Sequence, residues 1–253
     1  MPRIGTRKLY HMLTETLQQH GIKIGRDKLF DLLEEYGMLV RRRKRRKVST
    51  TDSNHPLRKY PNLVKELQVT GPNQLWVSDI TYIRLIDEFC YLSLVTDAYS
   101  RRIAGYCLYP TLQKEGPVAA LNMALNSLPA TIAESLIHHS DRGKQYCCDA
   151  YISMLEERKV MISMTEKGDP YENALAERIN RTLKDEFLLD KGFDNLELAS
   201  AAVSKAVNTY NTLRPHDSCD YLTPDQAHQH QGPLLMKWKK RKRKEPIETS
   251  FMY

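Results

Sequence analysis

The sequence predicts an α/β fold, a mixed sheet with flanking helices, preceded by a small helical segment. Three strand-like stretches follow one another at residues 76–83, 89–96 and 101–109, and helical and strand-like stretches alternate after them. A meander of strands followed by alternating helices and strands is typical of a sheet covered on its faces. The chain has 253 residues, of which 41% are apolar, so it can bury a substantial core.

Residues 1–47 are expected to form a helix-turn-helix-like DNA-binding segment. Leucines recur every four residues over 5–20, and a second apolar face occupies 26–36; a glycine follows each stretch and ends the helix. Two short helices joined by a glycine-containing turn, then an arginine-rich run, are typical of DNA binding. Simple packing of two amphipathic helices is the alternative. The basic run consists of Arg41, Arg42, Arg43, Lys44, Arg45, Arg46 and Lys47.

Residues 48–72 are rich in Ser, Thr, Asn and Pro, which predicts a linker with a short helix around Leu63–Leu67. A core domain is expected over 73–190 and begins with the three strands. Asp97 follows the second strand and is expected to shape the turn there with Arg101 or Arg102.

The remaining elements of the core alternate in type. Helical periodicity and turn residues then predict a C-terminal helical extension over 191–236 and a basic tail over 237–253. The expected helices are 116–128, 149–159, 171–188 and 195–212, and the expected short strands are 135–139 and 160–165, with a polar loop at 166–170.

Charge and cysteine content narrow the class of protein. The net charge is +7 and the isoelectric point about 9.1, which favours a polyanionic partner such as nucleic acid. Seven cations also crowd 237–244, and solvated tails are the alternative interpretation of both basic runs. Five cysteines without a C-x-x-C motif argue against a disulfide framework or a zinc site. The absence of a long apolar stretch predicts a soluble cytosolic protein without a membrane span.

Three carboxylates in distinctive settings carry the functional interpretation. Asp79 interrupts an otherwise apolar or hydroxylated strand, where a carboxylate is costly unless it is paired or metal-bound. Asp141 follows a short strand, at the strand end where open sheets place active sites. Glu177 lies in a helix, and 35 residues (142 to 176) separate it from Asp141. Exposed positions are the alternative for each alone, but together they are expected to converge on a pair of divalent cations.

The helix of Glu177 presents further polar residues on nearly the same face. Asn173 lies one turn before it and Lys184 two turns after it. Lys184 is expected to contact a DNA phosphate, although pairing with Asp185 or Glu186 is the alternative. His138 and His139 beside the second aspartate are interpreted as a packed strand end, not as metal ligands, and His216 as either a DNA contact or a cap of the last helix.

The sequence motifs around these residues resemble those of one protein family. Over residues 70–228 the chain has motifs similar to those of the second-reading-frame (orfB-type) transposases of bacterial insertion sequences, in the same order. The matching segments are WVSDIT at 76–81, DAYSR at 97–101, HHSDRGKQY at 138–146, ENALAERINRTLKDEF at 172–187, YNTLRPHDS at 210–218 and LTP at 222–224. Two departures stand out: Arg178 and Ile179 follow Glu177, where the family often has a small residue and an aromatic one, and Glu172 replaces an aspartate.

The resemblance implies a retroviral-integrase-like catalytic core with an RNase H-like fold. It implies a polynucleotidyl transferase that uses two Mg²⁺ ions, with Mn²⁺ as a substitute, to cut and join the element's ends. Double-stranded DNA, both terminal repeats and target, would be its partner. A homo-oligomer on DNA, a first-reading-frame partner protein and a place in the bacterial cytosol near the nucleoid are implied as well.

The residues that match the family pattern receive roles from this resemblance and from their positions. Asp79, Asp141 and Glu177 are the expected catalytic residues and metal ligands. A DNA-binding remnant without activity, acting as a repressor, and an RNase H-type nuclease are the alternative functions. The expected DNA contacts are Lys184, Arg178, Arg181, Asn173, His216 and the basic run from Arg41 to Arg46.

Overall fold

The computed structural model describes residues 1–40, 55–128, 135–166, 173–230 and 232–234. The basic run at 41–47, the loop at 167–170, the first residues of the helix expected from 171 and the tail from 237 lie outside the described residues. No helix in the described part is both long enough and apolar enough to span a membrane.

Within the described residues, five strands form one mixed sheet in the order β3-β2-β1-β4-β5. The first three run antiparallel as a meander, whereas β4 and β5 run parallel to β1. This topology confirms the predicted mixed α/β sheet, and each expected strand is present within two residues of its expected bounds. The strands are β1 (Leu75–Arg84), β2 (Phe89–Asp97), β3 (Ile103–Tyr109), β4 (Ile137–Ser140) and β5 (Met161–Met164).

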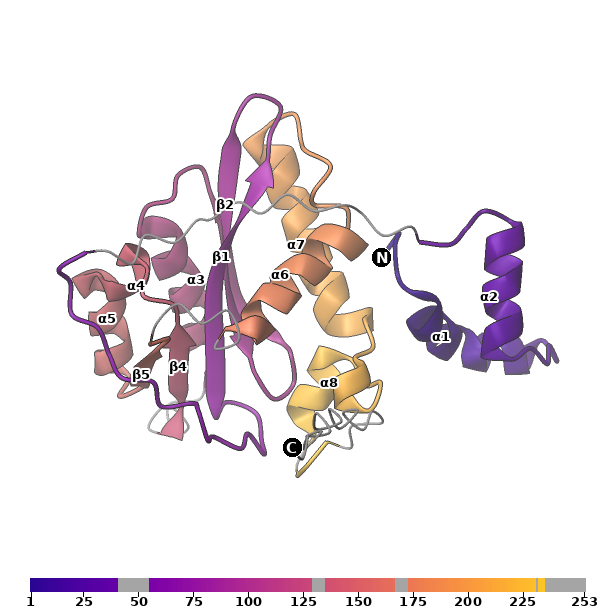
Figure 1. The fold of residues 1–253 in the computed structure, drawn as a ribbon, viewed down its shortest axis with the longest axis horizontal. Coiled ribbons are helices and arrows are strands. Elements are labelled where there is room, and N and C mark those ends of the chain that lie inside the picture. Colours follow the sequence, from indigo (N-terminus) through magenta and orange to yellow (C-terminus); the bar gives the residue numbers. More distant parts are fainter. Residues whose placement is uncertain (41–54, 129–134, 167–172, 231, 235–253) are drawn as a thin grey trace, which may run out of the picture.

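Helices cover both faces of the sheet, as Figure 1 shows on the two sides of β1. Alternate residues of β1 decide which core each face joins: Trp76 and Ile80 pack with α3 and α5, whereas Ile83 packs with α6 and α7. The two hydrophobic cores therefore lie on opposite faces of one strand. The covering helices are α3 (Glu115–Asn126), the short α4 (Lys144–Cys147), α5 (Asp149–Glu157), α6 (Ala174–Glu186) and α7 (Leu196–Leu213).

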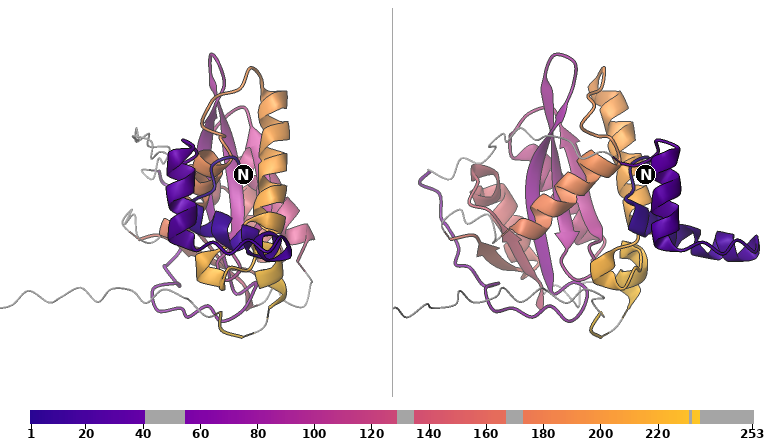
Figure 2. Two further views of the ribbon diagram at one scale, coloured as in Figure 1. Left: turned by 90° about the vertical axis from the view of Figure 1, so that its right-hand side faces the viewer. Right: turned by 45° about the vertical axis from the view of Figure 1, so that its right-hand side comes forward.

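The N-terminal helices α1 (Thr6–Gln19) and α2 (Arg26–Glu35) stand outside these layers, next to the C-terminal extension (Figures 1 and 2). Lys8 of α1 pairs with Asp217, with Nζ and Oδ1 3.3 Å apart. His11 stacks on Tyr221, with ring centroids 4.7 Å apart. Both helices were expected, and these contacts show that α1 packs on the chain's other end.

The segment that precedes the sheet is not helical around Leu63–Leu67, so that expectation was wrong. The main-chain N–H of Leu63 instead donates to Ser163 Oγ of β5 at 2.9 Å, and Met164 N donates to Pro61 O at 3.3 Å. Asn62 competes locally, because its Oδ1 accepts from Val64 N at 3.0 Å. Residues 61–63 thus lie against β5, and a turn follows them at 65–66.

The C-terminal extension contains two short elements that the sequence interpretation missed. One is a 3₁₀ turn at Asp217–Cys219, and the other is α8 (Pro224–Gln229). A capping box begins α8: Thr223 accepts from Gln226 N, and the Gln226 side chain accepts from Thr223 N. Thr-Pro followed by Gln was therefore a readable start signal, but six residues are too few for helical periodicity to reveal.

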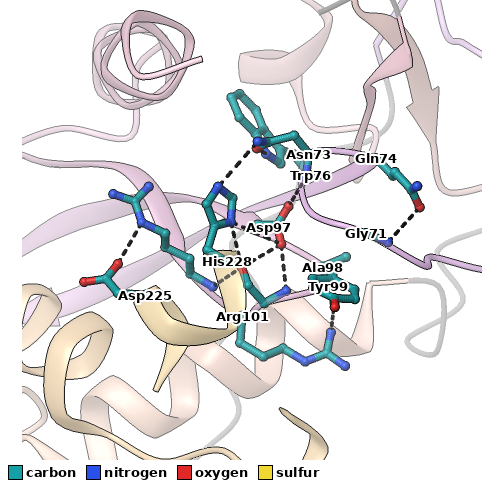
Figure 3. A network of polar contacts seen from close by, with 12 residues as sticks. Gly71, Asn73, Gln74, Trp76, Asp97, Ala98, Tyr99, Arg101, Asp225 and His228 are labelled. Atoms are coloured by element: carbon teal, nitrogen blue, oxygen red, sulfur yellow. Dashed lines mark hydrogen bonds and ion pairs between the residues drawn. The ribbon is translucent and has the colours of Figure 1, made fainter. Parts of the chain in front are cut away.

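Asp97 organises the turn after β2 more completely than expected (Figure 3). Its main chain pairs with Arg101 and Arg102, as expected for a turn, while its fully buried carboxylate accepts from Ser100 N and Asn73 N at 2.7 Å each. Burial alone would raise the pKa of Asp97, but hydrogen bonds from His228 of α8 and from Ser100 outweigh it and hold the pKa below its usual value. This carboxylate therefore joins the sheet to α8.

A buried ion pair fastens the end of α6 to the end of α7. The guanidinium of Arg214 donates to both carboxylate oxygens of Glu186, from Nε and Nη2, each at 2.7 Å, and its side chain is 5% exposed. Such a bidentate pair fixes geometry as well as charge. It also occupies the Glu186 carboxylate that was the alternative partner of Lys184.

Gly105 of β3 permits the closest approach of α3 to the sheet. A Cβ at this position would stand 2.1 Å from the main-chain oxygen of Ala120 and 2.8 Å from Ala124 N. Helix main chain cannot yield as a flexible side chain can. The helix therefore has to move for any larger residue to fit.

We predict that Gly105→Ala destabilises the protein by about 1–3 kcal/mol or more, because overpacking displaces α3. Urea unfolding followed by circular dichroism would measure it. Gly71→Ala is the matched control, since its Cβ would only reach ordinary contact with the Gln74 side chain at 3.4 Å. Equal stability of the two variants would contradict the close packing.

Candidate active site

Parallel pairing of β1 with β4 brings two of the three expected carboxylates together. Val77 of β1 lies opposite His139 of β4 in the parallel register. Two residues later come Asp79, still in β1, and Asp141, directly after the end of β4, so the register brings them close together. Because β4 ends at Ser140, β1 has an open edge from this point on. The carboxyl end of a strand at such an edge is where α/β sheets hold their sites.

The loop that carries Asp141 is shaped by the carboxylate itself. Its Oδ1 accepts from Gly143 N at 2.9 Å, which closes a tight turn directly after β4. A Cβ on Gly143 would lie 3.0 Å from that oxygen and 3.1 Å from Gln145 Oε1. Gly143, which has no Cβ, therefore leaves room for the Asp141 carboxylate to hydrogen-bond within its own loop.

Both oxygens of the Asp79 carboxylate accept a hydrogen bond. Oδ1 accepts from Ile80 N at 2.9 Å, and Oδ2 accepts from Asn180 Nδ2 of α6 at 2.8 Å. Burial and then the charge of Asp141 raise the pKa of Asp79 to about 7, with a further contribution from Glu177, while the two hydrogen bonds oppose the rise. Negative charge is therefore concentrated around Asp79, and the charges of Asp141 and Glu177 add to it.

Helix α6 carries the third carboxylate over the open edge of β1. Ile179 and Leu183 bury the inner face of the helix in the core, and Asn173 Nδ2 donates to Ser78 O at 3.0 Å. Glu177 lies between these anchors with its side chain exposed, and its charge reaches Asp79. The helix thus holds a solvent-accessible carboxylate near enough to Asp79 for its charge to act there.

The three carboxylates were expected to meet within a few ångströms. Among the described residues, no three His, Cys, Asp or Glu side chains are close enough together to hold one metal ion. Carboxylates repel one another when no cation lies between them, so an open arrangement is the one expected of these residues alone. The donors are nonetheless all carboxylate oxygens, which suits Mg²⁺ and Mn²⁺ and disfavours softer metals.

Lys184 contacts an aromatic ring near the aspartates. Its Nζ lies 3.7 Å from the centroid of the Tyr82 ring, and burial lowers its pKa to about 8 although Asp79 acts in the opposite direction. An ammonium over an aromatic face keeps part of its electrostatic stabilisation without water. The amine is therefore held over Tyr82 and close enough to Asp79 to feel its charge.

The other expected DNA contacts divide into exposed and buried residues. Arg178 and Arg181 are exposed on α6, next to Glu177. Asn173 is buried at 7% exposure and uses its amide on β1. His216 hydrogen-bonds Arg214 Nη1 at 2.7 Å, and burial followed by the charge of Arg214 lowers its pKa well below the usual value. The structure thus gives Asn173 and His216 partners within the protein.

The two histidines before Asp141 are packed, as expected. His138 lies between Ser78 Oγ at 2.7 Å and Tyr151 OH at 2.9 Å, and burial, then His139, lower its pKa to about 3. His139 Nδ1 lies 2.8 Å from Ser163 Oγ. Both side chains are buried. They support the strand behind the aspartates from within the protein.

Sequence reasoning missed two residues of this site, Asn180 and Tyr82. Asn180 follows Glu177 by three positions, so helical spacing could have placed it beside the glutamate. Tyr82 follows Asp79 by three positions in a strand, where alternation gives it the other face. Only the short length of β4, which leaves this part of β1 at an edge, lets α6 reach its ring.

Comparison with known proteins gives consistent matches. Models of an integrase core domain match residues 69–170 and 158–224. The 31-kDa protein of insertion element IS600 from Shigella sonnei is 38% identical over 224 residues, covering 87% of this chain and 79% of that protein. The transposase InsF of IS3A from Escherichia coli K12 is 35% identical over 167 residues, covering 65% of this chain and 57% of that protein.

A solved structure has the same fold across most of the chain. A chain in the cryo-electron-microscopy structure of a simian T-cell lymphotropic virus intasome superposes with a TM-score of 0.53 at 17% identity. The match covers 98% of this chain and 81% of that one. At this identity the likeness concerns the fold, and it agrees with the RNase H-like sheet expected from the sequence.

We predict that Asp79→Asn stabilises the metal-free protein at pH 8 by on the order of 1–3 kcal/mol, since each pKa unit corresponds to about 1.4 kcal/mol and solvent screens part of it. The raised pKa means that the folded state holds a proton near neutrality that the unfolded state has lost. The penalty for ionising Asp79 is therefore fully present above pH 7 and shrinks as the pH falls towards 4.

Urea unfolding in EDTA at pH 8 and pH 5 would test this, with a smaller gain expected at pH 5. Asp31→Asn on the exposed surface of α2 is the control and should change stability little. A loss of stability in Asp79→Asn at pH 8 would show that repulsion does not dominate this site.

Proposed function

Because the chain belongs to the insertion-sequence transposases that carry an integrase core domain, we propose that it is a DDE transposase that cuts and joins DNA strands in transposition. The observation that carries the proposal is the juxtaposition of Asp79 and Asp141 by the β1–β4 register, within reach of the charge of Glu177. The chain spans 57% of the InsF transposase and 65% of the IS904 transposase of Lactococcus lactis.

We propose that Asp79, Asp141 and Glu177 hold two divalent metal ions, Mg²⁺ with Mn²⁺ as a substitute. When bound, such ions activate an attacking oxygen and stabilise the leaving 3′ oxygen of a phosphodiester. The residues themselves supply the charge and its orientation. Asp79 is held by Ile80 and Asn180, Asp141 by its own loop, and Glu177 by the packing of α6.

The surrounding cations would bind the substrate. Lys184 would donate to a phosphate beside the scissile bond, and the exposed Arg178 and Arg181 would bind the flanking backbone. We propose that double-stranded DNA, terminal repeats and target alike, is the substrate, bound by a homo-oligomer in the bacterial cytosol. A first-reading-frame protein as partner, and DNA contacts through the run from Arg41 to Arg46, remain part of this proposal.

The two alternative functions differ from a transposase in the activities that each would show. A DNA-binding remnant would bind the element's ends without nicking them, and an RNase H-type nuclease would cleave an RNA–DNA hybrid and leave duplex ends intact. The retained carboxylates, each with its own positioning contacts, favour the transposase.

We predict that Asp79→Asn, Asp141→Asn and Glu177→Gln each abolish cleavage and strand joining but leave DNA binding nearly intact. Each amide preserves the size of the side chain and removes the charge that holds a cation. A nicking and joining assay on element ends, with binding followed by fluorescence anisotropy, would measure both. Asp185→Asn on the same helix is the control and should remain active.

Comparable nicking by any one of the three variants would remove that residue from the site. Absence of nicking by the unsubstituted protein on its own element ends, with binding preserved, would favour the remnant.

We predict that Lys184→Ala weakens end-specific binding and cleavage by roughly 1–3 kcal/mol, the value typical of a hydrogen bond to a charged group. Lys184→Arg keeps the charge and should retain most of the binding. Lys205→Ala removes an exposed lysine from α7 and serves as the control for net charge. Full activity of Lys184→Ala would reduce this lysine to a packing contact with Tyr82.

A further inference from the structure

Two asparagines fasten α6 to β1 on either side of Glu177. Asn173 is the residue that precedes α6 and Asn180 lies within it; they are seven residues apart, about two helical turns, and both face β1. Both side chains are buried, at 7% and 5% exposure, and both donate from Nδ2 to neighbouring residues of β1. Their partners differ: Asn173 binds the main-chain oxygen of Ser78, whereas Asn180 binds the Asp79 carboxylate.

The amide of Asn180 is thus directed at a carboxylate that repulsion would otherwise turn away. Asp79 lies in the field of Asp141 and Glu177, and the hydrogen bond from Asn180 to Oδ2 opposes the effect of this field on its pKa. Hydrogen bonds to an ionised acceptor are shorter and stronger than those between neutral groups. The contact therefore fixes the rotamer of Asp79 while leaving further lone pairs on both carboxylate oxygens.

The other half of the Asn180 side chain is unsatisfied. Its Oδ1 is buried and, like Oδ1 of Asn173, has no hydrogen-bond partner among the described residues. A buried acceptor without a donor is costly, and a helix fastened to a strand could use an apolar residue at this position instead. The Asn180 acceptor differs from that of Asn173 because it belongs to the side chain that binds the Asp79 carboxylate, so a donor that enters this site could reach it.

We propose that Asn180 is a positioning residue for the metal site: its amide holds Asp79 ready for a divalent cation, and its Oδ1 accepts a hydrogen bond from water carried by that cation. The inference rests on the proposed function of the three carboxylates. Partners of this kind orient metal ligands, and their loss typically lowers metal affinity 10- to 100-fold.

Mn²⁺ binding to the full chain without DNA tests this inference, with the free ion followed by electron paramagnetic resonance. We expect Asn180→Leu to weaken Mn²⁺ binding 10- to 100-fold. The matched control is Asn173→Leu, which removes a buried amide of the same helix face but spares the carboxylate, and should bind Mn²⁺ as the unsubstituted protein does. Thermal unfolding in EDTA should show that Asn180→Leu is no less stable than Asn173→Leu.

Two results would overturn the proposal. One is unchanged Mn²⁺ binding by folded Asn180→Leu; the other is an equal loss in both asparagine variants, which would reduce Asn180 to a helix fastener. If leucine prevents folding, Asn180→Ala repeats the comparison with Asn173→Ala without added bulk. Asp79→Asn distinguishes a failure of the proposed metal site from a failure of the role proposed for Asn180. If this variant binds Mn²⁺ normally, the carboxylates do not form the metal site, and the role of Asn180 is ruled out as well.

Discussion

Repulsion among carboxylates at the open edge of β1 is the constraint on which the rest of the site depends. A parallel register sets Asp79 beside Asp141, and α6 adds the charge of Glu177. Such a cluster weakens the isolated fold, so the surrounding structure has to hold each group in place. Asn180, Ile80 and the loop of Asp141 do so through hydrogen bonds. The proposed cation would relieve this repulsion and so offset the cost to stability.

The scaffold around this edge resists the repulsion by anchoring α6 along its length. Its inner face is buried with α7, and its last residue, Glu186, is held by the guanidinium of Arg214. Arg3 N donates to Glu186 O at 3.2 Å, so the N-terminal segment meets the same helix end. The helix that carries Glu177 therefore connects the sheet, the C-terminal extension and the first residues of the chain.

The sequence was sufficient for the order and type of the main elements, because apolar periodicity and turn residues are local signals. The sequence motifs around Asp79, Asp141 and Glu177 also identified these three residues as candidates. The side-by-side placement of the two aspartates depends on strand register, which no local pattern contains. Asn180 escaped notice because a polar residue in a helix is usually solvated, and α8 because it is short. The helix expected around Leu63 was lost to hydrogen bonds with β5, a non-local competition.

We propose that the three carboxylates form a divalent-metal site despite their open arrangement. Anomalous diffraction from crystals grown with Mn²⁺ tests it most directly, because it locates the ion without reference to activity. We expect an anomalous peak between Asp79, Asp141 and Glu177, with the Glu177 carboxylate closer to the two aspartates than in the metal-free protein. Density elsewhere on the protein, or none at saturating Mn²⁺ with the aspartates freely accessible in the crystal, would contradict it.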